Sequence, residues 1–425
     1  MQLLIKQGRV IDSVSGIDGV LDILIENGKI VEIGSNIQHS EAEIIDAAGL
    51  VVSAGLVDIH VHLREPGFEY KETIETGCAA AARGGVTSIA CMPNTKPVID
   101  TPELVTFVLE QADKACGVNV LPIAAVTKGQ QGKELTDTKA LAAAGVVAFS
   151  DDGVPIQDAN LMRNALMMAR DHKLPILTHS EDAGMVCNYA VNEGEVSRKL
   201  GIPGRPAIAE EIMIMRDAML AEETGSAVHV CHVSTARSVD IVRQYKKKGV
   251  SITCETCPQY FTLTEEEVLK QGTMARVNPP LRTQEDVEAI IAGLLDGTID
   301  AIVTDHAPHS AEEKARPLTE APSGMVGLET SLAISLTALL HSGKMNLPVL
   351  LRKMTYEPAR ILGVNKGRLA VGEDADIVIF DPNEEWIVNP ELFASKGRNT
   401  PFGGHKLKGH VKYTIVGGNV IYRDR

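Results

Sequence analysis

The sequence predicts an α/β protein: a (β/α)₈ barrel of the TIM type with a small β-sandwich domain formed by both chain ends. The middle of the 425-residue chain alternates short apolar segments with helical ones and supplies eight strand candidates. Both ends instead contain only strand-like segments. The predicted barrel therefore spans residues 55–362, and the β-sandwich domain takes residues 1–54 and 363–425. A doubly wound parallel sheet has the same rhythm, but the strand count favours the barrel.

The terminal segments show the alternation of half-buried strands. At the N-terminus these are "LLIKQGRVID", "GVLDILIENGKIVEIG" and "EIIDAAGLVVSAG", and Asn27-Gly28 predicts a type I′ hairpin. Near the C-terminus they are "GRLAVGEDADIVIFD", "EEWIVN" and the hairpin-like "YTIVGGNVIYR". The simplest packing joins both groups into one domain.

The middle segments follow one another in strand–helix order. The strand candidates are "LVDIHVH", "VTSIACMPN", "NVLPIAAV", "GVVAFSDD", "LPILTHS", "AVHVCHVS", "VSITCET" and "AIVTDHAPH". The helical segments are "TIETGCAAAARGG", "TPELVTFVLEQADKA", "LMRNALMMARDH", "AIAEEIMIMRDAMLAEETG", "SVDIVRQYKKKG" and "EDVEAIIAGLLDG". Each unit has the length of one β/α repeat.

Composition narrows the class of function. The net charge of −15 argues against a nucleic-acid or anionic-membrane partner. No apolar run reaches the roughly 18–20 residues of a membrane span, and the N-terminus lacks a signal-peptide layout. Seven scattered cysteines fit a reducing compartment, so a cytoplasmic location is expected. "CETC" (Cys254, Cys257) is a lone pair at a strand end and is interpreted as structural.

Polar residues gather at the carboxyl ends of the strand candidates. They are His60, His62, Asn94, Asp151, Asp152, His179, His232 and Asp305. In a barrel these ends converge on one face, where active sites lie. His60 and His62 share a side of their strand and can bind one ion together. Four histidines and two aspartates are too many for one four-coordinate zinc but suit two zinc ions with a shared carboxylate. His229, inside its strand, is interpreted as core filling.

Eight motifs in order resemble the amidohydrolase superfamily, and most closely the class I bacterial dihydroorotases. They are "GLVDIHVHLREPG", "CMPNTKP", "FSDDG", "LTHSED", "HVCHVST", "ETCPQY", "NPPLR" and "TDHAPH", followed by "HSAEEK" and "GLET". The resemblance covers nearly the whole chain. It implies the same barrel and the same small β-domain.

The resemblance also implies metal ligands. His60, His62 and Asp305 would hold the more buried zinc, and His179 and His232 the second. Asp152 matches the bridging carboxylate and Asp151 its neighbour. Related hydantoinases and allantoinases commonly bridge with a carboxylated lysine. The strand end "GVVAFSDDG" has no lysine, which favours the class I dihydroorotase type.

The implied reaction is the reversible cyclisation of N-carbamoyl-L-aspartate to L-dihydroorotate plus water, a step of de novo pyrimidine biosynthesis. Two zinc ions would activate a bridging water as hydroxide, and Asp305 would be the single acid–base group. Arg64 shares the side of His60 and His62, and its planar guanidinium suits the substrate carboxylate. The resemblance adds substrate contacts from His62, Asn94 and His309 near the carboxylate, and from Asn278 and the backbone at Ser323 and Gly324 near the ring amides. Many relatives have an apolar residue in place of Ser323, so no side-chain role is expected there.

Two other functions compete with this prediction. One is another cyclic amidase, namely a hydantoinase, dihydropyrimidinase or allantoinase. The other is a non-catalytic scaffold for aspartate transcarbamoylase, but such proteins lose metal ligands and all six are present here. A homodimer is expected, and an association with aspartate transcarbamoylase is compatible with activity. The polar segment 306–317 is either a lid over the site or an exposed loop.

Overall fold

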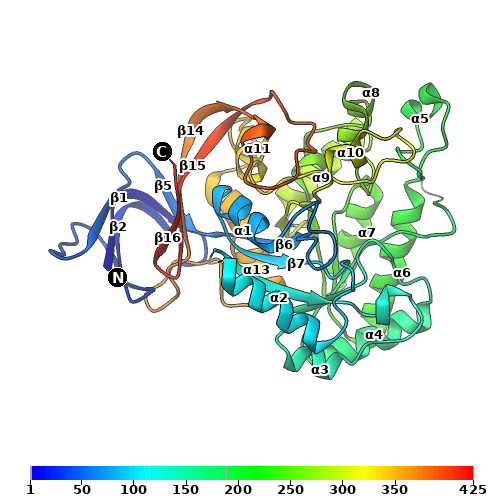
Figure 1. The fold of residues 1–425 in the computed structure, drawn as a ribbon, viewed down its shortest axis with the longest axis horizontal. Coiled ribbons are helices and arrows are strands. Elements are labelled where there is room, and N and C mark those ends of the chain that lie inside the picture. Colours follow the sequence, from blue (N-terminus) through cyan, green and yellow to red (C-terminus); the bar gives the residue numbers. More distant parts are fainter. Residues whose placement is uncertain (1, 116, 187–188, 425) are drawn as a thin grey trace.

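The computed structural model describes residues 2–115, 117–186 and 189–424, and it contains the predicted parallel barrel (Figure 1). Its strands are β6 (Leu56–Val61), β7 (Val86–Cys91), β8 (Asn119–Ala124), β9 (Ala148–Ser150), β10 (Ile176–Thr178), β11 (Val228–Val230), β12 (Ile252–Thr256) and β13 (Ala301–Ile302). Each strand pairs with the next one along the chain. A parallel bridge between Val61 and His306 joins β6 to the end of β13 and closes the ring. The eight strand candidates are all confirmed.

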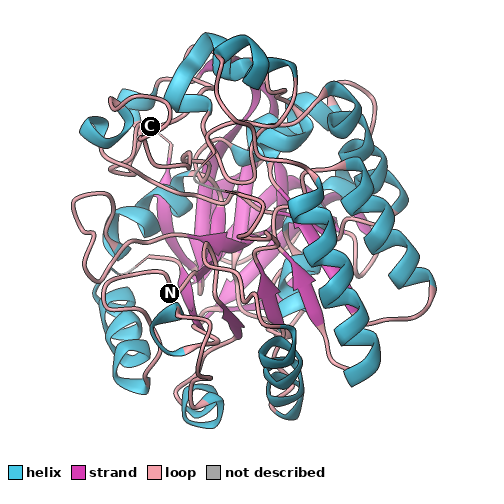
Figure 2. Cartoon of the chain, turned by 90° about the vertical axis from the view of Figure 1, so that its right-hand side faces the viewer, coloured by secondary structure: helices cyan, strands magenta, loops and turns pink. Residues whose placement is uncertain are grey.

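Helices surround these strands (Figure 2). The six predicted helices are α1 (Ile74–Arg83), α2 (Pro102–Ala115), α4 (Ala159–Asp171), α6 (Ile208–Thr224), α7 (Ala236–Lys247) and α9 (Gln284–Asp296). Shorter helices that the sequence patterns did not predict are α3 (Thr138–Ala143), α5 (Glu195–Leu200), α8 (Glu267–Gln271), α10 (Ala311–Lys314), α11 (Ser331–Ser335), α12 (Leu347–Met354) and α13 (Tyr356–Leu362). Single turns occur at η1 (Lys128–Gln130), η2 (Pro258–Phe261), η3 (Gly272–Ala275), η4 (Leu336–Leu340) and η5 (Pro390–Leu392).

Side-chain caps explain where several helices begin. Thr73, Asp158, Thr235 and Thr283 precede α1, α4, α7 and α9, and each accepts a hydrogen bond from a backbone N–H of the first turn. The cap satisfies one of the amides that a helix leaves without a partner. The cap sequences therefore fix the positions of helices that follow the strand-end loops.

Both chain ends form one mixed sheet beside the barrel (Figure 1). Its strands are β1 (Gln2–Asp12), β2 (Ile17–Glu26), β3 (Lys29–Gly34), β4 (Glu43–Asp46), β5 (Val51–Ala54), β14 (Ile377–Ile387), β15 (Lys406–Val416) and β16 (Asn419–Arg423). β1 is irregular between Ile5 and Gly8, and it pairs with β4 before this point and with β5 after it. Apolar residues from both chain ends share one separate core cluster. Asn27 and Gly28 both have positive φ, as the predicted type I′ turn requires.

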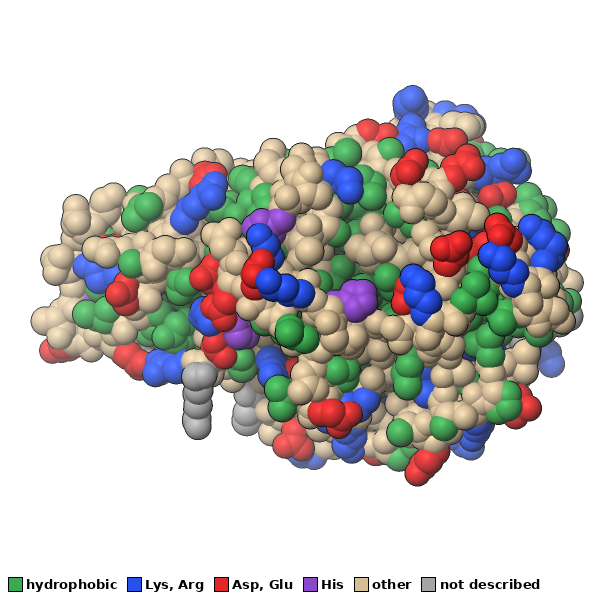
Figure 3. Space-filling model, turned by 90° about the horizontal axis from the view of Figure 1, so that it is seen from above, with side chains coloured by type: hydrophobic (Ala, Val, Ile, Leu, Met, Phe, Trp, Pro, Cys, Tyr) green, Lys and Arg blue, Asp and Glu red, His purple; other side chains and the backbone are tan. Residues whose placement is uncertain are grey.

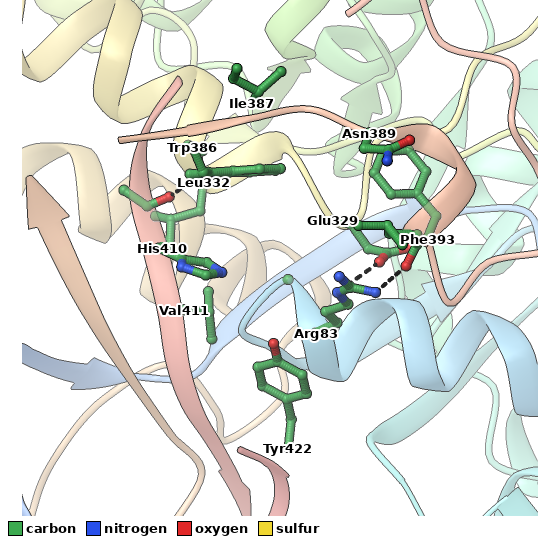
Figure 4. A pocket seen from close by; sticks show the side chains of 14 residues that line it. Arg83, Glu329, Leu332, Trp386, Ile387, Asn389, Phe393, His410, Val411 and Tyr422 are labelled. Atoms are coloured by element: carbon green, nitrogen blue, oxygen red, sulfur yellow. Dashed lines mark hydrogen bonds and ion pairs between the residues drawn. The ribbon is translucent and has the colours of Figure 1, made fainter. Parts of the chain in front are cut away.

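The terminal sheet and the barrel meet at Gly55, between β5 and β6. A Cβ atom at this position would lie 2.1 Å from the Thr87 side chain, so only glycine fits. Farther out, a cavity of about 80 Å³ separates α1 from β14 and β15 (Figure 4). Arg83 and Glu329 form an ion pair at its edge, and Glu329 also accepts from the backbone N–H of Ala394. These contacts join the two parts of the chain.

The described residues contain no helix that is both long and apolar enough to cross a membrane. The face seen in Figure 3 carries acidic and basic side chains interspersed, with no broad basic area.

Candidate active site

The ends of the barrel strands bring the predicted metal ligands together. They come from or just after β6 (His60, His62), β9 (Asp152), β10 (His179), β11 (His232) and β13 (Asp305), and all six are buried. Because these strands are parallel neighbours in a closed ring, side chains far apart in sequence meet at one end of the barrel.

One group of possible ligand atoms includes His60 on β6 and His62, which directly follows this strand. The His62 Nε2 atom lies 3.1 Å from Asp305 Oδ1, and the His60 Nε2 atom lies 3.6 Å from the same oxygen. The three ligand atoms lie within 4.8 Å of one another, as donors around one ion do. Their arrangement agrees with the first predicted ligand set.

A second group surrounds the Asp152 carboxylate. Its Oδ1 atom lies 3.5 Å from both His60 Nε2 and His179 Nδ1, and 3.8 Å from His232 Nε2. The Oδ2 atom faces His62 Nε2 at 3.6 Å. Burial would raise the pKa of Asp152, but the nearby imidazole rings of His179, His232 and His60 outweigh it and hold the pKa well below its usual range. Asp152 thus presents an ionised carboxylate to both groups, as a bridging ligand would.

These donor atoms fit a cation better than they fit one another. The His60 Nε2 and Asp152 Oδ1 atoms are fully buried, face each other and have no hydrogen-bond partner. When the His62 Nδ1–H donates to Asn94 Oδ1 at 2.9 Å, the lone pair of Nε2 points at the Asp305 carboxylate. Two buried acceptors facing one another are costly unless a cation lies between them. Imidazole and carboxylate together are typical zinc donors.

Asp151 is the predicted neighbour of the bridge, and it turns away from the site. Its Oδ1 atom accepts from the backbone N–H groups of Val126 at 2.8 Å and Thr127 at 3.1 Å, and Oδ2 accepts from the Thr127 hydroxyl. Burial raises the pKa of Asp151 to about 6. Asp151 therefore holds the loop that follows β8.

Backbone geometry at the site is unusual for residues with side chains. Arg64, His232 and Asp305 all have positive φ, at 62°, 34° and 48°. This region is costly for residues other than glycine, and it is retained where the surrounding structure requires a particular side-chain direction.

Glu255 at the end of β12 lies behind His60 and was not among the predicted site residues. Its Oε1 atom lies 2.5 Å from His60 Nδ1, and its Oε2 atom lies 3.0 Å from His229 Nε2. Burial would raise the pKa of Glu255, but His60 and His229 hold it well below its usual range. Glu255 therefore fixes the His60 ring with Nε2 toward the site. His229 is buried as expected, and it supports this carboxylate instead of filling space only.

We expect Glu255→Gln to weaken metal binding by about 10- to 100-fold while the fold is kept. The amide is a poorer acceptor for the His60 Nδ1–H and can present an N–H to the ring instead. Competition with a chelating dye measures the affinity. Asp217→Asn, which neutralises a buried carboxylate paired with Arg216 on α6, is the matched control. Equal affinities for the wild type and Glu255→Gln would contradict this role.

A cavity of about 200 Å³ lies directly against the ligand groups. Its walls include every candidate metal ligand except His60, and every predicted substrate contact, namely His62, Arg64, Asn94, Asn278, His309, Ser323 and Gly324. A wider vestibule shares Gly153, Asn278 and Ser323 with it. The cavity thus connects the candidate metal centre to the outside.

One side of this cavity contains Arg64 and His309. The Arg64 Nη2 atom lies 3.5 Å from His309 Nε2, and Nε donates to the carbonyl of Pro308 at 3.3 Å. Burial, with Arg64, Lys71 and Lys314 nearby, holds the pKa of His309 well below its usual range. His309 is therefore a neutral ring beside a guanidinium. Asn94, predicted for the same side, also donates to Asp152 Oδ2 at 3.2 Å.

On the opposite side, Asn278 has a fixed orientation. Its Oδ1 atom accepts from the buried Arg205, and its Nδ2 atom lies 3.1 Å from His179 Nε2. Arg205 was not predicted, because an arginine in a loop carries no strand-end signal. It holds Asn278 with the amide N–H₂ toward the site.

Buried contacts hold the loop that carries Ser323 and Gly324. The Lys314 Nζ atom donates to the carbonyls of Pro322 at 3.0 Å and Gly324 at 3.1 Å, and burial lowers the pKa of Lys314 to about 7. Asn399, from the C-terminal segment, donates to the Gly324 carbonyl at 3.0 Å. A Cβ atom on Gly324 would lie 2.8 Å from that of Ala307. Segment 306–317 thus has buried anchors at His306, His309 and Lys314, and its closing as a lid stays a prediction.

Known protein families and relatives match this chain over most of its length. Residues 49–238 match the family model "Dihydro-orotase-like", and residues 290–422 match the "Amidohydrolase family" model. The chain is 49% identical over 423 residues to a dihydroorotase of Acetivibrio thermocellus, covering 100% of this chain and 99% of the relative. It is 51% identical over 429 residues to a dihydroorotase of Pelotomaculum thermopropionicum, with the same coverage.

Solved structures share the fold at lower identity. The L-hydantoinase (dihydropyrimidinase) from Arthrobacter aurescens superimposes with a TM-score of 0.89 at 27% identity, covering 99% of this chain and 96% of that one. The whole-length identity of about one half is to dihydroorotases, and it extends over both the barrel and the terminal sheet. The chain belongs to the dihydroorotase family of the amidohydrolase superfamily.

Proposed function

We propose that the chain interconverts N-carbamoyl-L-aspartate and L-dihydroorotate, with ring closure releasing water. One observation carries this proposal: Arg64 faces the same cavity as the buried histidines and aspartates. A cation-binding centre beside a carboxylate-binding guanidinium suits a cyclic amide that carries a carboxylate. Full-length identity to dihydroorotases supports the choice of substrate over other cyclic amides.

The centre would hold two zinc ions. His60, His62 and Asp305 would bind one, His179 and His232 the other, and Asp152 both. When bound, such ions lower the pKa of a coordinated water toward neutrality and polarise a carbonyl oxygen. The unpaired His60 Nε2 and Asp152 Oδ1 atoms support this assignment.

The surrounding residues would bind and orient the substrate. Arg64 would donate two parallel hydrogen bonds to the carboxylate, with the neutral His309 and Asn94 beside it. Asn278 and the backbone at Ser323 and Gly324 would contact the ring amides. These contacts would place the amide carbonyl carbon of the substrate next to Asp305.

Asp305 would move the proton. In hydrolysis, water oxygen bonds to the ring carbonyl carbon while an Asp305 oxygen takes the water proton. The C–N bond then breaks, and Asp305 returns that proton to the departing nitrogen. In ring closure, the substrate carboxylate first takes up a proton, and Asp305 removes the nitrogen proton as the C–N bond forms. Asp305 then gives that proton to the oxygen that leaves as water.

Activity assays test this proposal directly. We expect the metal-replete protein to act on dihydroorotate and carbamoyl aspartate, with little activity on hydantoin, dihydrouracil or allantoin. Removing metal with a chelator should abolish turnover, and zinc should restore it at about two ions per chain. Preference for hydantoin would favour the other cyclic amidases, whose fold the Arthrobacter structure shares. Full activity without metal would end the proposal.

We also propose two domain boundaries and one protein partner. A boundary at residues 54 and 55 is supported by the change from β5 to β6 at Gly55, and one at residues 362 and 363 by the end of α13. Segment 388–405, within the C-terminal part, also reaches the barrel through Asn399. Association with aspartate transcarbamoylase stays a prediction, to be tested by co-sedimentation with the purified transcarbamoylase.

A further inference from the structure

The outer face of α6 carries a continuous apolar stripe. Its members are Ile208, Ile212, Met215 and Met219, whose exposed fractions are 41%, 44%, 43% and 56%. Between residues 208 and 219 these four are the exposed side chains of the helix. These four side chains form the α6 stripe.

Such an outer face is unusual for a barrel helix. α6 also buries an apolar inner face, which includes Met213, Ile214 and Ala218. A helix at a protein surface normally has one apolar face and one polar face. The neighbouring α7 follows this rule, with Arg237, Asp240, Gln244 and Lys247 exposed. A helix that is apolar on both faces indicates that something covers the outer one.

The spacing of the stripe suits a second helix. Successive members are four, three and four residues apart, so they lie along one side of α6 for about 16 Å. This is the spacing of the seam between two packed helices. In an antiparallel pair of α6 helices, Ile208 of each copy would face Met219 of the other, and Ile212 would face Met215. Each contact then occurs twice, as twofold symmetry requires.

The charges beside the stripe favour a second copy over a charged partner. α6 contains five acidic residues, and each pairs with a cation of its own chain. The pairs are Glu210–Arg282, Glu211–Arg237, Asp217–Arg216, Glu222–Lys248 and Glu223–Arg163. The surroundings of the stripe are therefore neutral, although the chain carries a net charge of −15. Two copies can approach here without like-charge repulsion, whereas a strongly basic or acidic partner would find no complementary charge.

The apolar area is sufficient for the centre of a dimer interface. The four side chains expose roughly 350 Å², close to half of the ~800 Å² that each partner contributes to a standard stable interface. Met185 adds exposed apolar surface beside the start of α6, where Asp182 donates from its backbone to Ala209 at 2.9 Å. The face lies on the side of the barrel away from the terminal sheet, so that sheet does not obstruct it (Figure 1).

We propose that two copies of this chain pair through the α6 stripe, with the two α6 helices antiparallel about a twofold axis. This arrangement gives the expected homodimer a location, an orientation and a register. It does not depend on the substrate or on the metals.

Sedimentation equilibrium of the full-length, metal-replete protein tests the proposal. The wild type should sediment at twice the chain mass of 45.5 kDa. Met215→Glu places two unpaired carboxylates near the twofold axis and should weaken dimerisation by about 100-fold or more. Gln244→Glu adds the same charge to the outer face of α7 and should leave the dimer unchanged. A monomeric wild type, or a dimer unaffected by Met215→Glu, would overturn the proposal.

A pair of complementary substitutions tests the register. It also shows whether a weaker dimer in the single variants results from misfolding. Ile208→Lys and Met219→Glu should each weaken the dimer. Combined in one chain, they should restore dimerisation by at least tenfold, because each lysine then faces a glutamate of the other copy. Within one copy the two positions are too far apart to pair. Additive weakening in the double variant would exclude the antiparallel register.

Discussion

Asp305→Asn should lower kcat by about 10²- to 10⁴-fold in both directions, the usual contribution of a positioned acid–base group. Asparagine keeps the shape of the side chain but cannot accept and return a proton. Asp305 Oδ1 faces both His60 and His62, so the substitution also changes a candidate metal ligand. Metal content must therefore be measured beside kcat. Glu312→Gln, on the exposed side of α10 shortly after the same strand, is the matched control and should retain full activity.

The pH dependence of the wild type separates the proton role of Asp305 from its ligand role. Hydrolysis needs the carboxylate form to accept a proton, so kcat for dihydroorotate should rise with pH and level off. Ring closure takes up one proton overall, because the substrate carboxylate loses an oxygen atom as water, so kcat for carbamoyl aspartate should be highest at low pH and fall as pH rises. The midpoints belong to the coupled site as a whole. Profiles that rise together in both directions would rule out a single shuttle and point to a separate acid.

Arg64→Met should lower kcat/KM for dihydroorotate by about 30- to 1000-fold, or about 2–4 kcal/mol. Methionine keeps much of the apolar stem and removes the guanidinium that would bind the carboxylate. Arg64 lies in the cavity wall without being a candidate metal ligand, so metal content should not change. Steady-state kinetics with metal analysis on the same preparation measures both.

A second substrate, which lacks the carboxylate, distinguishes the loss of carboxylate recognition from a general loss of activity. Dihydrouracil has the same ring without the carboxylate, so its residual hydrolysis should be nearly equal in the wild type and in Arg64→Met. Arg316→Met, at an exposed position beyond α10, provides a control for the loss of one arginine. If both substrates lose activity in parallel, Arg64 supports the loop at Pro308 and not the carboxylate.

Local patterns in the sequence determined the architecture. The eight strand segments and six helical segments appear at the predicted places, because burial of one helix face or of a whole strand leaves a periodicity that can be read without the fold. The Asn27-Gly28 hairpin was likewise predicted, since only a few residues tolerate positive φ at both turn positions. The short helices were missed because four to eight residues carry too little periodicity.

The sequence also determined which polar residues meet at the site, and the tertiary structure decided what each one faces. Strand ends and motif order identified His60, Asp152 and Asp305, because parallel strands in a ring must converge. Only the structure separates Asp152, which faces the histidines, from Asp151, which turns to Val126 and Thr127. Adjacent residues at a strand end point in different directions, and nothing in their order says which direction is inward.

The supporting residues were decided by the tertiary structure alone. Glu255 reaches His60 across 195 positions, Arg205 reaches Asn278 across 73, and Asn399 reaches Ala307 across 92. None of the three belongs to a periodic pattern that marks it as part of a site. Their contacts exist because closing the barrel and returning the C-terminal segment bring distant backbone together. Burying those polar atoms costs free energy, and hydrogen bonds to their new partners offset this cost. No local stretch of sequence specifies these partners.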